Sequence, residues 1–311
     1  MGRFIVRRIL MVIPVLFGIT FIIFALLYIL PGDPVRLMVG PSANPETVEQ
    51  IRREMGLDRP FIIQYFDYLK QLSTGDFGRS YQTRRLISTE LISVVPKTVE
   101  LAVTAEIFSA LIGITLGTLA AANKNGLIDR FVTALAALQL SFPLFWLALM
   151  LQLLLAVELK LLPSSGYQGG IDKYILLPAI TLAIPSSGIL ARLTRTTVSD
   201  VLREDYIRTA RSKGLVERLI YLRHALPNAL IPIITMIGLD LTRLVGGIAI
   251  IEVIFSWPGL GKYAYDALVF RDLPALQASV IIFAVFVSLI NLLVDIFYGV
   301  IDPRIRQAAT A

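Results

Sequence analysis

Long apolar stretches dominate this chain, and they restrict the folds open to it more than any other feature. About 18 or more consecutive apolar residues mark a helix that can cross a membrane. Six stretches approach or exceed that length: residues 9–30, 99–122, 131–157, 174–191, 225–251 and 276–301. With 56% hydrophobic and 17% charged residues, the 311-residue chain is far more apolar than a soluble domain. The pattern predicts an all-α polytopic membrane protein with six transmembrane helices.

The first apolar stretch allows two interpretations, because basic residues precede it. Arg3, Arg7 and Arg8 followed by apolar sequence could open a cleaved signal peptide. The stretch is 22 residues long, however, and the turn-forming sequence LPGDP follows it in place of a small-residue cleavage site. We therefore expect a retained spanning helix.

The polar segment after the first stretch is expected to lie outside the membrane. Residues 45–55 and 59–72 have the apolar spacing of amphipathic helices, and Asn44 stands where a helix N-cap is expected. This organisation predicts two units. Residues 1–94 form the first spanning helix with its external segment, and residues 95–305 form the membrane core.

Lysine and arginine are distributed unequally among the loops, which predicts the orientation of the chain. The 192–224 loop holds eight basic residues, whereas the short loops on the other side, 158–173 and 252–275, hold two each. The segment 31–97 holds nine, but segments of such length translocate largely regardless of charge. Because short cytoplasmic loops carry the excess of basic residues, we expect both termini and the 192–224 loop to be cytoplasmic.

Charge and composition exclude several other functions. A net charge of +6 and a pI of about 9.6 could indicate nucleic-acid binding, but the basic residues lie at the ends of the apolar stretches, as in membrane proteins. The chain has no cysteine, so it can form neither disulfides nor thiolate metal sites. With His224 as its single histidine, it has no histidine cluster either, and we expect no metal site.

Residues 204–227 are the most informative part of the chain. Ala210, Gly214 and Leu215 stand where two short helices could meet at a turn of small residues, with Asp205, Arg208, Arg211 and Lys213 keeping their surroundings polar. A rigid helix–turn–helix of this kind suits a groove on a partner protein. From charge alone, an ordinary basic loop would be the simpler interpretation.

The spacing of this segment resembles the EAA loop of binding-protein-dependent ABC importer permeases. That loop has the pattern E-A-A, three residues, Gly, nine residues, I-x-L-P. Here residues 208–210 read Arg-Thr-Ala, Gly214 follows after three residues, and His224, one residue and Leu226-Pro227 follow after nine. Arginine and threonine replace the first two residues of the pattern, and His224 replaces isoleucine.

The resemblance extends over nearly the whole chain and is to the dipeptide, oligopeptide and nickel permease family. The matching fragments, in order, are LPGDP at 30–34, MGLDRP at 55–60, GDFGRS at 75–80, DYIRTARSKGL at 205–215, RHALPNAL at 223–230, IFSWPGLG at 254–261, RDLP at 271–274 and NLLVDIFYGVIDPRIR at 291–306. One such fragment alone would be weak evidence, but their number and order make the resemblance specific.

Membership of that family would imply a MetI-like core of five helices with one extra N-terminal helix, in the cytoplasmic membrane of a bacterium or archaeon. It implies a homologous second permease subunit, two cytoplasmic ATPase subunits and an extracytoplasmic solute-binding protein. Contact with the ATPase would fall on the 192–224 loop, at Asp205, Arg208, Ala210, Arg211, Gly214 and Leu215. The solute would be a dipeptide, an oligopeptide, glutathione or a nickel chelate.

The chain is expected to be no enzyme and to hold no cofactor itself. Its single Gly-Lys pair, Gly261-Lys262, is followed by Tyr263 and does not form a nucleotide-binding P-loop. The resemblance therefore implies that ATP and Mg²⁺ are bound by the partner ATPases.

Three of the charged residues inside the apolar stretches are candidates for a translocation path: Glu106, Asp240 and Arg243. Such residues are costly in lipid and usually face a bundle interior or an aqueous path. Asp240 and Arg243 are three residues apart on one helix face, so they could form a structural ion pair or line a translocation path. Two other functions remain open from the residues alone: an ion-coupled secondary transporter that uses Asp240, or a membrane enzyme with Asp240 and Glu106 as an acid dyad.

The sequence SWPGLG at 256–261 predicts a turn at the outer end of the fifth stretch. Pro258, Gly259 and Gly261 favour the turn, and Trp257 is expected to be an aromatic anchor at the membrane interface. Near the inner end of the last stretch, Asp295 is expected to have a structural role.

Overall fold

The computed structural model describes residues 2–29, 34–39, 43–54, 56–139, 141–170 and 172–301. Within these ranges the secondary structure is helical, apart from one isolated bridge between Arg79 and Leu86. The helices are α1 (Gly2–Ile29), α2 (Pro34–Val39), α3 (Pro45–Glu54), α4 (Phe61–Ser73), α5 (Ile87–Ala122), α6 (Leu127–Gln139), α7 (Leu144–Leu151), η1 (Gln152–Glu158), α8 (Lys173–Val201), α9 (Asp205–Ser212), α10 (Glu217–Leu219), η2 (Ile220–Ala225), α11 (Leu226–Ile254), α12 (Leu260–Val269) and α13 (Leu273–Ile301).

Five helices of the described chain are long and apolar enough to cross a membrane, or six if one bent pair is counted as a span. The five contain the segments Val6–Leu26, Ile87–Ala122, Lys173–Val201, Glu217–Ile254 and Leu273–Ile296. The prediction of an all-α polytopic protein is confirmed. LPGDP, except for its last residue, and the basic tail after Ile301 lie outside the described residues.

The third predicted span is divided more sharply than the sequence indicates. Leu127–Gln139 and Leu144–Glu158 are separate helices bent by 107°. Pro143 is the N-cap of the second helix, with φ of −60° and ψ of 137°. Because proline lacks an N–H group and disfavours helical backbone in the residue before it, a helix ends before this position and a new one begins after it.

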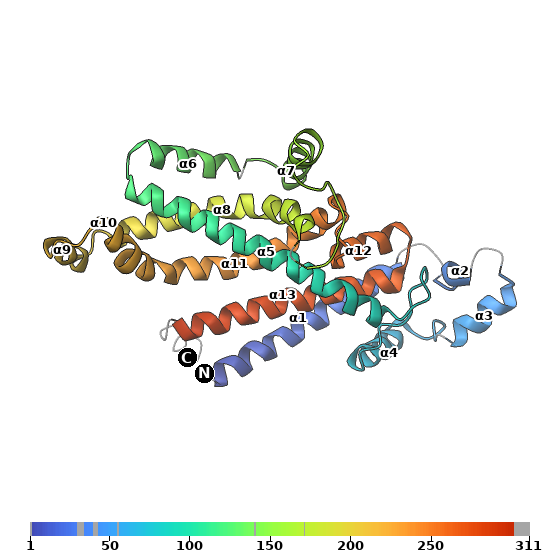
Figure 1. Cartoon of the computed structure of the whole chain (residues 1–311). Coiled ribbons are helices and arrows are strands. Elements are labelled where there is room, and N and C mark those ends of the chain that lie inside the picture. The colour runs from blue at the N-terminus through green and yellow to red at the C-terminus, as the bar shows by residue number, and fades with distance from the viewer. Residues whose placement is uncertain are drawn as a thin grey trace.

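The core is built on close contact between α5 and α8, which lie side by side over much of their length (Figure 1). Gly113 and Gly117 allow this approach, since a Cβ atom at Gly113 would lie 2.6 Å from the Cβ of Leu190. Small residues at helix contacts are a general means of close packing in membranes. Helix α11 packs against the same pair, and Leu101, Ile175 and Ile248 are fully buried among them.

Helix α6 is fastened to α8 by a buried ion pair. The Arg195 guanidinium donates two hydrogen bonds to the Asp129 carboxylate, one of them 2.7 Å long, and only 4% of the Asp129 side chain is exposed. The backbone N–H of Asn125 donates to the same carboxylate. A bidentate pair fixes geometry as well as charge, so the α5–α6 turn is held against α8.

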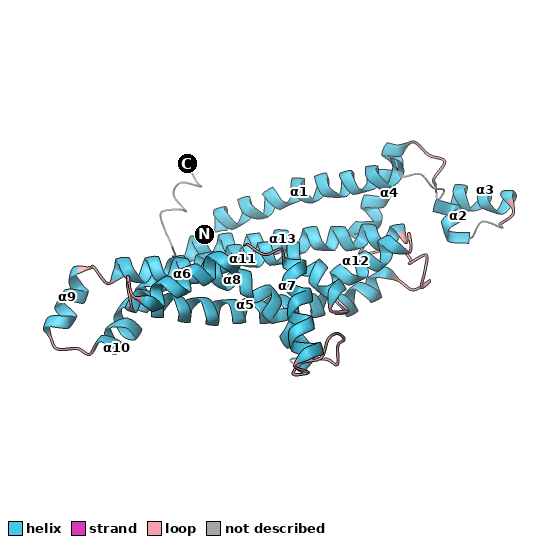
Figure 2. Ribbon diagram, turned by 90° about the horizontal axis from the view of Figure 1, so that it is seen from above, coloured by secondary structure: helices cyan, strands magenta, loops and turns pink. Residues whose placement is uncertain are grey.

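Helix α1 lies along α13, away from the α5–α8 pair (Figures 1 and 2). Arg8 and Asp295 form an ion pair of 3.1 Å between these helices, which agrees with a structural role for Asp295. At the other end, Tyr65 of α4 is buried against α1, where its hydroxyl lies 3.0 Å from that of Thr20. The predicted external helices are also present, and Asn44 accepts a hydrogen bond from the Glu46 N–H at the start of α3.

Candidate functional site

The segment between α8 and α11 projects beyond the ends of the long helices (Figures 1 and 2). Helix α8 continues to Val201, so the exposed segment begins ten residues later than the predicted 192–224 loop. Within it, α9 and α10 are separated by a turn that contains Gly214. The predicted helix–turn–helix is therefore present, as a small structural unit attached to the bundle.

A small hydrophobic cluster holds this unit together. Ile207 and Ala210 on α9 pack against Ile220 of η2, and Leu202 and Leu215 cover the cluster. Ile207 and Ile220 are fully buried. This packing places Ala210 inside the unit, so its contribution to any partner surface is indirect.

Gly214 ends α9 in a left-handed conformation with φ of +77°. Its N–H donates to the Arg211 carbonyl, and the Leu215 N–H donates to the Ala210 carbonyl. Glycine is the usual residue at such helix ends, because a side chain is strained at positive φ. Within this chain a Cβ atom at Gly214 would have no neighbour within 4 Å, so the position is also open on its outer side.

Polar side chains cover the outer face of the unit. Asp205 and Arg208 are 95% and 75% exposed, and 3.4 Å separates their charged groups. Arg211 donates to Glu217, which ties α9 to α10, and these hydrogen bonds raise the pKa of the Arg211 guanidinium. The unit thus combines an internally fixed shape with an exposed charged surface.

The second candidate site lies within the bundle, where Glu106 of α5 and Asp240 of α11 come together. Both side chains are buried, and their carboxyl groups are close enough to interact with each other. Ser186 of α8 lies beside Asp240 and is close enough to act on its carboxyl group. Neither oxygen of Glu106 has a hydrogen-bond partner in the described part of the chain.

Arg243 is exposed and forms no ion pair with Asp240, although its charge acts on Asp240 from a distance. The structural ion pair considered from the sequence is therefore not formed in this conformation. Both residues instead line one pocket of about 220 Å³. Its other lining residues include Gln139, Phe142 and Ser186, and apolar side chains complete the wall. Glu106 does not line the pocket but contacts Asp240 directly behind it.

A glutamate that no sequence motif marks organises the end of the core opposite the α9–α10 unit (Figure 1). Glu252 is fully buried and accepts hydrogen bonds from the Thr98 hydroxyl at 2.6 Å, the Gly261 N–H at 2.6 Å and the Lys262 N–H at 3.1 Å. It therefore joins α5, α11 and the start of α12. Nothing in the local sequence distinguishes it, because its donors lie on two other helices, α5 and α12.

The expectation of an interfacial anchor at Trp257 is wrong. Trp257 is fully buried, its indole N–H donates to the Lys97 carbonyl, and Tyr167 packs against its ring edge-on. Gly259 and Gly261 are needed for space: a Cβ atom at either position would collide with Glu252. The SWPGLG segment is thus a tightly packed connection between α11 and α12.

Comparison with known proteins shows which family this sequence matches. The sequence matches the family model described as "Binding-protein-dependent transport system inner membrane component" over residues 113–307, and its N-terminal companion model over residues 1–102. The dipeptide transport system permease protein DppB of Alkalihalophilus pseudofirmus is 37% identical, with 96% of this chain and 98% of the relative covered. The glutathione transport system permease protein GsiC of Salmonella typhimurium is 39% identical, with 98% and 99% covered.

Solved structures give the same fold at lower sequence similarity. The MetNI methionine ABC transporter in inward-facing conformations matches with a TM-score of 0.56 and 20% identity, covering 71% of this chain and 97% of that chain. An amino acid ABC transporter crystallised with histidines matches with a TM-score of 0.52, covering 68% and 93%. The MetI-like fold expected from the sequence is confirmed.

Proposed function

The chain belongs to the binding-protein-dependent transport system inner membrane components, the permease subunits of ABC importers, and we propose that it carries peptide-like solutes into the cell. Family membership rests on matches that cover nearly the whole sequence. A dipeptide and glutathione are both short and amide-linked, and each carries an ammonium group and at least one carboxylate. Since the relatives named for them resemble this chain about equally, the proposed solute class includes both.

The proposed coupling surface is the outer face of the α9–α10 unit, with Asp205, Arg208, Arg211, Gly214 and Leu215 as its residues. Its support is the fixed shape of a projecting unit whose charged side chains face outward. A rigid unit can transmit the movement of an ATPase to the spanning helices, whereas a flexible loop would deform without transmitting it. Ala210 contributes by packing inside the unit.

The proposed assembly contains a second, homologous permease subunit, two cytoplasmic ATPases and an extracytoplasmic solute-binding protein. ATP and Mg²⁺ would be bound by the ATPases, so this chain would use no cofactor of its own. Family membership supports ATPase and binding-protein partners in general, and their number and identity are part of the proposal. Movement of the ATPases would rock the α9–α10 unit together with α8 and α11, from which it extends.

The proposed translocation path passes the pocket that contains Asp240 and Arg243, with Glu106 behind Asp240. Charges of both signs at one pocket suit a solute with an amino group and a carboxylate at its two ends. The pocket has only about 220 Å³ in this single subunit. We therefore expect the second permease subunit to complete the path.

Dependence on ATP tests the function. Uptake of a labelled dipeptide and of labelled glutathione should require the cognate ATPases with an intact P-loop lysine, and should persist when the proton gradient is collapsed while ATP is maintained. Uptake that follows the proton gradient and is indifferent to the ATPase substitution would favour the ion-coupled alternative that uses Asp240.

Single cysteines test the orientation, since the natural chain has none. Ser73, Ser165 and Ser212 are all exposed, so each cysteine should be accessible from its own side. In sealed cells, an impermeant maleimide should label Ser73→Cys and Ser165→Cys but not Ser212→Cys until the membrane is opened. Labelling of Ser212→Cys in sealed cells would reverse the proposed orientation and remove the coupling assignment.

A further inference from the structure

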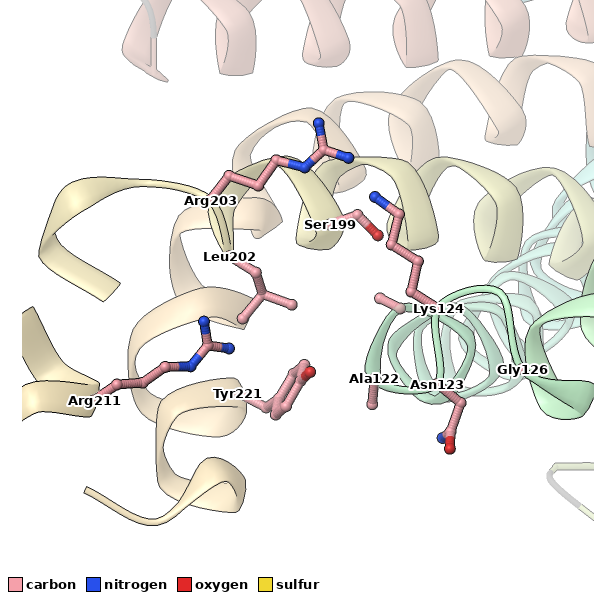
Figure 3. A pocket seen from close by; sticks show the side chains of 10 residues that line it. Ala122, Asn123, Lys124, Gly126, Ser199, Leu202, Arg203, Arg211 and Tyr221 are labelled. Atoms are coloured by element: carbon pink, nitrogen blue, oxygen red, sulfur yellow. The ribbon is translucent and has the colours of Figure 1, made fainter. Parts of the chain in front are cut away.

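A pocket of about 460 Å³ lies beside the α9–α10 unit, at the same end of the bundle (Figure 3). Three separate parts of the chain line it: the α5–α6 turn, the end of α8 and the segment from α9 to η2. Its lining includes Lys124, Arg203 and Arg211 but no acidic residue. In Figure 3 the side chains of Arg203 and Arg211 extend toward the same space that Lys124 and Tyr221 enter from other elements.

Two of these cations are exposed and have no ion-pair partner within the described chain. No hydrogen bond or ion pair connects the side chain of Lys124 or of Arg203 to another described residue. Arg211 differs, because Glu217 already binds it. Basic side chains without ion-pair partners repel each other when they extend into the same pocket. An anion bound between them relieves this repulsion.

A buried hydroxyl adds an independent indication of a ligand. Ser199 of α8 is 8% exposed, and its Oγ atom has no hydrogen-bond partner among the residues that the structure describes. In Figure 3 this hydroxyl points into the pocket, toward Lys124. Buried polar atoms are nearly always paired, so an orphaned hydroxyl beside two free cations is a suitable donor to an oxyanion.

We propose that this pocket binds a phosphate group, held by Lys124, Arg203 and the Ser199 hydroxyl. The pocket lies where the long helices end, because α5 ends at Ala122, α8 ends at Val201, and the following apolar span begins at Glu217, so we place it near the membrane surface. Its cytoplasmic location rests on the proposed orientation. Basic pockets at this depth bind headgroups of acidic phospholipids, and a soluble phosphate compound offers the same oxygens.

The bound group would connect the core to the coupling surface. Lys124 and Ser199 belong to elements that the Asp129–Arg195 ion pair and the α5–α8 contact hold together. Arg211 of α9 and Tyr221 of η2 lie on the other wall, which belongs to the segment that carries the α9–α10 unit. A phosphate between the two walls would therefore influence how firmly that unit is held.

The test uses the complete transporter, purified in a neutral detergent and stripped of lipid. Phosphatidylglycerol, phosphatidylcholine and glycerol 1-phosphate are titrated separately, and binding is followed by native mass spectrometry and by the shift in Tm. Lys124→Gln combined with Arg203→Gln should weaken binding of the phosphate-bearing ligand about tenfold or more, since each basic contact contributes to headgroup affinity. Ser199→Ala should weaken it less.

The matched control is Arg130→Gln combined with Arg218→Gln, which removes the same charge from exposed positions outside the pocket. It should leave ligand binding unchanged. Loss confined to phosphatidylglycerol identifies a lipid, and loss confined to glycerol 1-phosphate identifies a soluble ligand; either supports the site. Equal weakening in the pocket and control variants, or none in either, overturns it.

Assembly is measured on the same samples, so that the two proposals can fail separately. If the pocket variant loses its ATPases while phosphate binding is unchanged, the pocket is a protein contact and the phosphate site is wrong. If the unaltered chain fails to bind ATPases but its phosphate binding depends on Lys124 and Arg203, the proposed function fails and the phosphate site stands.

Discussion

Gly214→Glu should abolish transport and solute-stimulated ATP hydrolysis while the chain still reaches the membrane. Two effects combine at this position. The left-handed backbone, with φ of +77°, costs a side chain about 1–2 kcal/mol. The larger effect comes from the partner, because the outer side of Gly214 is open in this chain and a carboxylate there would enter the proposed ATPase groove. ATPase co-purification and hydrolysis are the measurements.

Gly75 provides the matched control for backbone strain. It has φ of +75°, no neighbour within 4 Å of a Cβ atom, and a place in an exposed turn on the opposite side of the bundle. Gly75→Glu should therefore carry a similar local strain but leave hydrolysis and ATPase binding intact. Gly214→Ala should fall between the two, with reduced coupling. Normal assembly and hydrolysis in Gly214→Glu would contradict the coupling assignment.

Local patterns explain why the helices and the coupling turn could be predicted from the sequence. The length and apolarity of a spanning helix are properties of consecutive residues, and so is the glycine that ends α9. Pro143 is a local signal of the same kind, because a proline marks where a helix ends. The size of the bend is not local, since α7 packs against α8 and α11.

Contacts between distant elements explain what the sequence could not predict. Glu252 accepts hydrogen bonds from a threonine 154 positions away and from two backbone N–H groups of the following helix. No pattern in the local sequence predicts these contacts. The residue type of Trp257 favours the membrane interface, whereas the fold buries it against Tyr167 and the Lys97 carbonyl of α5. The neighbours of Asp240 are equally hidden in the sequence: spacing allows a pair with Arg243 on the same helix, and the fold brings Glu106 and Ser186 to it from other helices.

Asp240→Asn should lower solute uptake at least tenfold, equivalent to about 1.4 kcal/mol, with little change in folded yield. If Asp240 and Arg243 formed a buried ion pair, the same change would cost several kcal/mol of stability by leaving Arg243 uncompensated. Arg243 is exposed, however, and no ion pair joins it to Asp240. Asparagine has nearly the shape of aspartate, carries no charge, and can donate a hydrogen bond to the unpaired oxygens of Glu106.

Asp295→Asn is the control, because it also replaces a carboxylate within a spanning helix but lies outside the pocket. It breaks the 3.1 Å ion pair with Arg8, whose partly exposed setting limits the loss of stability to about 1 kcal/mol. Uptake per folded molecule should stay normal in this variant, the reverse of the result for Asp240→Asn. If Asp240→Asn instead lowers the yield of folded protein, and adding Arg243→Gln restores both yield and uptake, the two residues form a structural pair and the solute path lies elsewhere. Restored yield without uptake would keep both residues on the path, since only their contact with the solute would then be missing.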